Sequence, residues 1–120
     1  MRRSFAHEAL LVTSDDADAG APGAAVTKLL CGSWQHEGPC PLAPHHTQAT
    51  RDAPHLRVRV LFAVEPELES TVRQRIVEAL SGGSLSRGPG DSTGWKLVHS
   101  EASDVTASEA AHATRLAQAP

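Results

Sequence analysis

The segment 55–80, HLRVRVLFAVEPELESTVRQRIVEAL, decides the fold expected of this chain. Its first ten residues predict a strand, because apolar side chains recur at every second position and share one face. Arg57 and Arg59 begin the second face, and apolar residues continue it. The strand therefore becomes buried on both sides as it proceeds, which is typical of a central strand in a sheet.

The second part of this segment, residues 66–80, predicts a helix. Its apolar residues repeat every four positions and form a core stripe: Leu68, Val72, Ile76 and Leu80. Glu69 can pair with Arg73 one turn later, and the pair Gly82-Gly83 is a typical helix end.

Weaker patterns predict the remaining elements. Apolar runs indicate strands at 7–13, 26–30 and 94–100, of which the first two could form a hairpin. Small, polar and glycine-rich segments predict a mobile loop at 14–25, a polar connector at 47–54, and a flexible loop at 84–94. Residues 55–100 could form a right-handed βαβ crossover or a hairpin return. Thr106 and Glu109 form a capping-box pattern that opens an alanine-rich helix, before a disordered tail at 118–120.

Together these elements predict a single α+β domain over residues 1–120. It would hold a mostly antiparallel sheet of about four strands with two helices on one face. A net charge of −3 weighs against a dedicated nucleic-acid binder. No apolar run approaches the length of a membrane span, and the N-terminus does not resemble a signal peptide, so we expect a cytoplasmic protein. In that reducing compartment the two cysteines would be ligands or free thiols.

The segment 31–46, CGSWQHEGPCPLAPHH, concentrates the reactive residue types and predicts an inserted metal-binding knuckle without helix or long strand. Cys31 and His36 are separated by four residues, as are Cys40 and His45. Two thiolates and two imidazoles form the closed ligand set typical of structural Zn²⁺. His46 is the alternative fourth ligand. Two other interpretations stay open: a proline-rich loop with free thiols, or a Cys31–Cys40 disulfide.

Familiar zinc motifs do not fit this spacing. A nucleic-acid-reading finger separates its cysteine pair from its histidine pair by about twelve residues, whereas here the ligands alternate. The deaminase signature needs a second cysteine three residues after the first, and Ala43 stands there instead. The metalloprotease helix is excluded by Gly38-Pro39.

These observations favour a non-enzymatic zinc protein, an accessory subunit or assembly factor that contacts a protein partner. The residues expected at that contact are Trp34, Pro41 and Pro44. One alternative is a small metalloenzyme with an open coordination position and Glu37 as base. The other is an RNA-binding module using Arg57, Arg59 and Trp34. Two further histidines, His7 and His112, are expected to be exposed.

Overall fold

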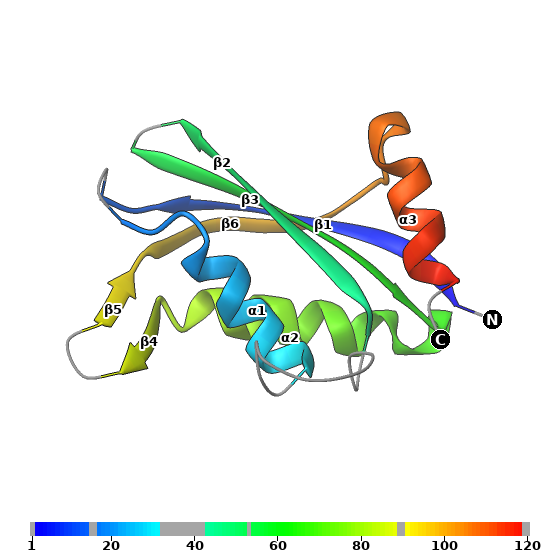
Figure 1. Cartoon of the computed structure of the whole chain (residues 1–120), viewed down its shortest axis with the longest axis horizontal. Coiled ribbons are helices and arrows are strands. Elements are labelled where there is room, and N and C mark those ends of the chain that lie inside the picture. The colour runs from blue at the N-terminus through cyan, green and yellow to red at the C-terminus, as the bar shows by residue number, and fades with distance from the viewer. Residues whose placement is uncertain (1, 15–16, 32–42, 53, 89–90, 119–120) are drawn as a thin grey trace.

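The fold is built on a twisted four-stranded antiparallel sheet in the order β2–β3–β1–β6 (Figure 1). The computed structural model describes residues 2–14, 17–31, 43–52, 54–88 and 91–118. The elements are β1 (Arg3–Val12), α1 (Ala21–Cys31), β2 (His45–Asp52), β3 (His55–Val64), a 3₁₀ turn (Pro66–Leu68), α2 (Glu69–Ser81), β4 (Ser84–Gly88), β5 (Asp91–Gly94), β6 (Lys96–Ser103), a second 3₁₀ turn (Ala107–Glu109) and α3 (Ala110–Ala117).

The expected α+β class and antiparallel sheet are confirmed, and the connectivity can now be specified. β1 pairs antiparallel with both β3 and β6, so β3 and β6 run parallel on either side of it. The unit from β3 through α2 to β6 is therefore a crossover, with β1 inserted between its two strands. With β1, α1 and β2 before it, this order is the split-βαβ, or ferredoxin-like, topology. Such a fold hosts many functions and implies none by itself.

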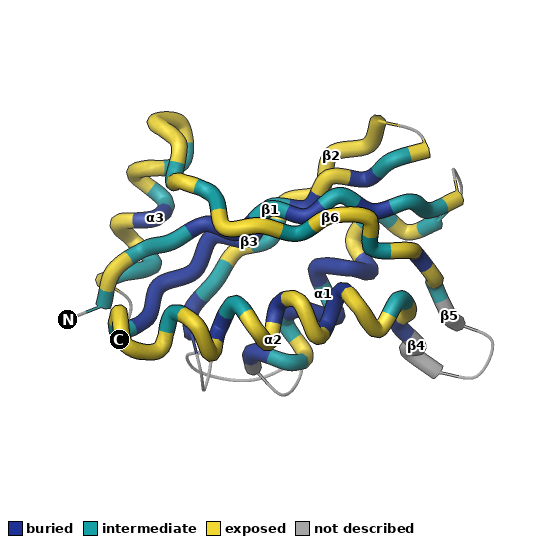
Figure 2. The backbone as a smooth tube through the Cα atoms, turned by 180° about the vertical axis from the view of Figure 1, so that it is seen from behind, coloured by how far each residue is buried: buried dark blue, intermediate teal, exposed yellow. Residues whose placement is uncertain are grey.

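The core lies between the sheet and the two helices α1 and α2, on what we call the inner face. Figure 2 shows the buried residues along β1 and β3 and on α1. The alternate residues of β3 that the sequence assigned to one face are all buried here, together with the α2 stripe: Leu56, Val58, Val60, Phe62, Val64, Val72, Ile76 and Leu80. Leu68 was expected to join that stripe but is 39% exposed in the 3₁₀ turn.

The strand expected at 26–30 is wrong, because these residues belong to helix α1. Val26 and Leu30 are buried while Lys28 between them is exposed, which fits a helix, because a strand would place all three on one face. Pro22 is tolerated in the first turn. A side chain at Gly23 would place Cβ 2.6 Å from the Thr47 hydroxyl, so this glycine permits close packing of α1 against β2. The predicted loop over 14–25 thus contains the start of a helix.

Four further segments differ from expectation. β2 occupies 45–52, where the end of the knuckle and a polar connector were expected, and it pairs with β3 from His55 to Phe62. Cys31, the other end of the predicted knuckle, closes α1. The loop expected at 84–94 contains the two-stranded hairpin of β4 and β5. The strand expected at 7–13 begins earlier, at Arg3.

The end of α2 follows the prediction from Gly82-Gly83. Gly83 has a φ of +73°, the left-handed conformation that glycine adopts without strain. The Trp95 indole Nε1 donates a hydrogen bond to the carbonyl oxygen of Leu80 at 2.9 Å. This buried tryptophan therefore satisfies one of the carbonyl groups that a helix end leaves without an intrahelical partner.

The last helix, α3, lies on the opposite side of the sheet from α1 and α2, on what we call the outer face (Figure 1). The prediction of two helices on one face holds for α1 and α2, but α3 is not one of them. The capping box is confirmed, with Thr106 and Glu109 bonded reciprocally to the backbone. In the described part of the chain, no helix is long and apolar enough to cross a membrane.

Candidate functional site

The two ends of the segment 31–46 lie close together in the fold. α1 ends at Cys31 and β2 begins at His45, and the two elements pack against each other. The Nε2 atom of His45 lies 2.9 Å from the hydroxyl of Thr27. Thr27 precedes Cys31 by four residues, which is about 6 Å along a helix axis. The fold therefore brings the first and last predicted ligand positions to neighbouring places on the inner face.

The hydrogen bonds of His45 define its tautomer. Its Nδ1 lies 3.2 Å from the carbonyl oxygen of Ala43, which can only accept, so Nδ1 carries the proton. In the neutral ring, Nε2 then holds the lone pair that faces Thr27. Histidines that bind a metal commonly donate their second ring N–H to a backbone carbonyl in this way. The Thr27 hydroxyl has one proton for two acceptors, since it also lies 3.1 Å from the carbonyl of Gly23.

His46 occupies a different environment from His45. Successive residues of a strand point to opposite faces, and the contacts agree with this rule. The His46 ring is exposed and lies 4.5 Å, between ring centroids, from the ring of His112 on α3. Partial burial, and next the neighbouring His46, lower the pKa of His112. His112 is only partly exposed, contrary to expectation. Only His45 of the two candidate fourth ligands shares a face with the end of α1.

The other predicted site residues divide into two groups. Pro44 is buried at the entry to β2, and its carbonyl accepts a hydrogen bond from the Ala63 amide at 3.0 Å. The remainder lie outside the described residues: Trp34, His36, Glu37, Cys40, Pro41 and the Cys31 side chain. Among the side chains that the structure does describe, no three of the types His, Cys, Asp and Glu are grouped to hold a metal.

A buried polar cluster that the sequence did not indicate lies between β1, β6 and α2. His7, expected to be exposed, is only 4% exposed. Its Nδ1 lies 3.1 Å from an Arg73 nitrogen and its Nε2 lies 2.6 Å from the Ser100 hydroxyl. Arg73 also bonds to Glu69 at 2.8 Å, as predicted, and its guanidinium stacks over the Phe62 ring. Burial, and next the charge of Arg73, lower the pKa of His7 to about 4.

The hydrogen bonds of this cluster run in the wrong direction for nucleophilic catalysis. A guanidinium can only donate, so Nδ1 of His7 must accept from Arg73, and Nε2 must carry the proton. His7 therefore donates to Ser100, whereas a base that activates serine must accept the hydroxyl proton. The cluster stabilises the packing of α2 on the sheet. The period-two pattern could have located it, since His7 alternates with buried Ala9 and Leu11.

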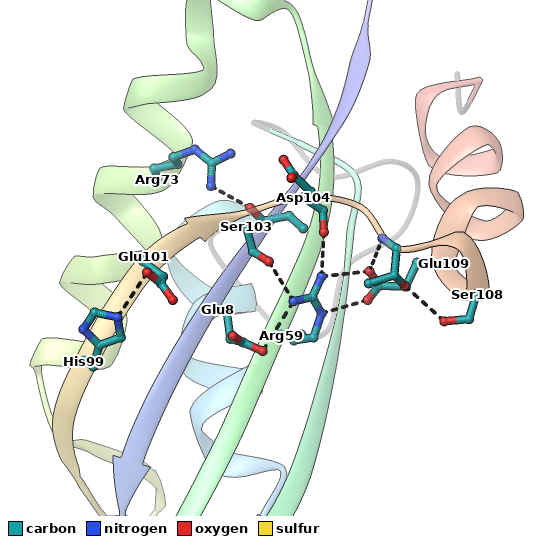
Figure 3. A network of polar contacts seen from close by, with 11 residues as sticks. Glu8, Arg59, Arg73, His99, Glu101, Ser103, Asp104, Ser108 and Glu109 are labelled. Atoms are coloured by element: carbon teal, nitrogen blue, oxygen red, sulfur yellow. Dashed lines mark hydrogen bonds and ion pairs between the residues drawn. The ribbon is translucent and has the colours of Figure 1, made fainter.

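A second polar cluster fixes the C-terminal segment on the outer face (Figure 3). Arg59 bonds to both carboxylate oxygens of Glu109, at 3.0 and 2.8 Å, and to Glu8 at 3.4 Å. It also donates to the Ser103 hydroxyl and the Asp104 carbonyl. The hydrogen bond to Glu109 chiefly raises the pKa of Arg59, and the same bond chiefly lowers the pKa of Glu109 to about 2. Because two carboxylates already surround Arg59, its charge is poorly placed to contact RNA.

Comparison of the chain with known protein families, with curated proteins and with solved structures gave no significant match.

Proposed function

We propose that this chain is a small non-enzymatic zinc-binding protein in which Cys31, His36, Cys40 and His45 hold Zn²⁺ structurally. It would act through a protein partner, as an accessory subunit or assembly factor. The observation that carries the proposal is the contact between His45 and Thr27, which lies one helical turn before Cys31 on α1. A structural zinc site holds four ligands in a closed tetrahedron, so the two ends of a ligand-bearing segment must come close together.

We assign His45, and not His46, as the fourth ligand. The Nδ1 proton of His45 is directed to the Ala43 carbonyl, which leaves Nε2 as the metal-binding atom. On binding, the Thr27 hydroxyl would donate to the Gly23 carbonyl alone. His46 lies on the outer face beside His112, away from the end of α1. The metal would join α1 to β2 and contribute stability to a core that is rich in alanine.

The test is the zinc content of protein purified without added metal, by elemental analysis. The parent and His46→Gln should each hold about one equivalent of zinc, whereas His45→Gln and Cys31→Ser/Cys40→Ser should hold less than about a tenth. His46→Gln is the matched control because it changes the neighbouring residue to the same amide. Chelation should also lower the melting temperature of the parent but not of the double-cysteine variant.

Three results would overturn the proposal. If the parent protein holds no zinc and has two titratable thiols, the segment is a plain loop. If it holds no zinc and has no titratable thiols, Cys31 and Cys40 form a disulfide. Equal loss of zinc in the His45 and His46 variants would show that the protein binds zinc but that the assigned set of four ligands is wrong.

A further inference from the structure

A cavity of about 350 Å³ opens on the outer face, at the end of the sheet farthest from α3. In Figure 1 this is the end at which β2 and β3 are joined, while α3 lies over the opposite end. The walls of the cavity come from β1, β2 and β3, and its lining residues are Leu10, Thr50, Arg51, Asp52, His55 and Arg57. Cavities that bind small molecules start at about this volume, so only a small ligand would fit.

Arg57 is the residue that gives this cavity its chemistry. It is exposed, and in the described part of the chain its guanidinium has neither a hydrogen-bond acceptor nor an ion-pair partner. Across the sheet it lies opposite Thr50 on one side and Leu10 on the other. One row of the sheet thus presents a hydroxyl, a free guanidinium and an apolar side chain. The next row adds the half-buried His55.

We propose that this cavity binds a small organic carboxylate. The guanidinium of Arg57 offers two parallel donors to the carboxylate, the geometry for which arginine is best suited. The Thr50 hydroxyl supplies a third donor, and a short aliphatic group would cover Leu10. The same strand shows the pattern once already, since Arg59 holds the carboxylate of Glu109 with two nitrogens.

The charges around the cavity favour a carboxylate over a phosphate. The guanidinium of Arg51 is directed to the carbonyls of Ser14 and Ala17, so Arg57 is the arginine with donors left for a ligand. The carboxylate of Asp52 offsets the positive charge that Arg51 retains. Asp52 also lines the cavity and would repel a second negative charge. A monoanion with an apolar tail therefore matches the site better than a phosphate dianion.

The test uses isovalerate, with isoamyl alcohol and isopentylamine as probes of the same shape and different charge. Their binding is followed by NMR of ¹⁵N-labelled protein through the Arg57 Nε–H signal and the Leu10 amide. Of the three organic probes, we expect only isovalerate to give saturable shifts. Inorganic phosphate should bind more weakly than isovalerate. Arg57→Gln should weaken isovalerate binding roughly tenfold. Arg75→Gln, at an exposed position on α2 across the sheet, should leave the affinity unchanged.

Three outcomes would overturn the proposal. One is an isovalerate response that does not saturate, and another is the same response to the alcohol or the amine. The third is unchanged affinity in Arg57→Gln, whose folding is checked by its remaining amide signals. None of these depends on zinc, so this test and the zinc measurement can fail separately.

Discussion

Two adjacent positions on the outer face carry the same residue type in opposite situations. Arg59 and Arg57 lie two positions apart on β3 and point to the same side of the sheet. Arg59 is enclosed by Glu8, Glu109 and the chain that leads into α3, so its side chain is 18% exposed. Arg57 lines the cavity, and among the described residues its guanidinium has no hydrogen-bond or ion-pair partner.

The difference comes from where the chain runs after β6. The segment that follows Ser103 turns over the sheet and delivers Glu109 to Arg59, fifty residues away in sequence. It stops short of the row that holds Arg57. An arginine on this sheet face is therefore structural where a distant segment of the chain covers it, and available for binding where no such segment reaches it.

The largest expected effect is the loss of Arg59. Arg59→Ala would leave two carboxylates close together without their shared cation, and should reduce the free energy of unfolding by about 2–3 kcal/mol. Arg57→Ala should change it by less than about 0.5 kcal/mol, as exposed substitutions generally do. Urea unfolding of both variants measures the contrast. Equal losses would mean that the enclosed position of Arg59 has no energetic consequence.

A smaller effect, with a defined pH dependence, is expected from Glu109. Its folded pKa of about 2 lies below the ordinary value of 4.5, so its ionised form is preferentially stabilised in the folded state. This contribution is complete above pH 4.5 and is lost as the pH falls toward 2. Glu109→Gln should cost about 1–2 kcal/mol at neutral pH.

The pH series supplies the control for this prediction. The difference between parent and Glu109→Gln, measured by urea unfolding at successive pH values, should shrink below pH 4.5. A difference that stays constant down to pH 3 would show that the charge on Glu109 is not what Arg59 recognises. The cause would then be the shape of the side chain.

The same contrast shows why local patterns predicted some elements and missed others. β3 and α2 were predicted because each buries a residue set with its own period, two for Val58 and Val60 and four for Val72 and Ile76. α1 was misassigned because its Pro22 and Gly23 are typical of loops, and only the neighbouring Thr47 explains the glycine. β2 is polar except for Ala49, so its identity as a strand comes from pairing with β3 rather than from its own sequence.

The candidate sites were predictable to a similar, partial extent. The spacing of cysteine and histidine predicted a ligand set, and strand alternation then separates His45 from His46 once β2 is known to begin at residue 45. No local pattern distinguishes Arg57 from Arg59, because the partner of Arg59 arrives from another part of the chain. For the same reason the cavity beside Arg57 could not be anticipated from the sequence.

The smallest expected effect concerns the helix cap that positions Glu109. One carboxylate oxygen of Glu109 accepts from the Thr106 amide at 3.0 Å and also from Arg59 at 2.8 Å. Thr106→Ala removes the hydroxyl half of the capping box and should cost about 1 kcal/mol, while Thr106→Ser keeps the hydroxyl and most of the stability. In an Arg59→Ala background the cost should fall, because the capped segment is no longer held on the sheet. Urea unfolding of the four combinations measures this coupling, and an equal cost in both backgrounds would show that the cap and the arginine contact act independently.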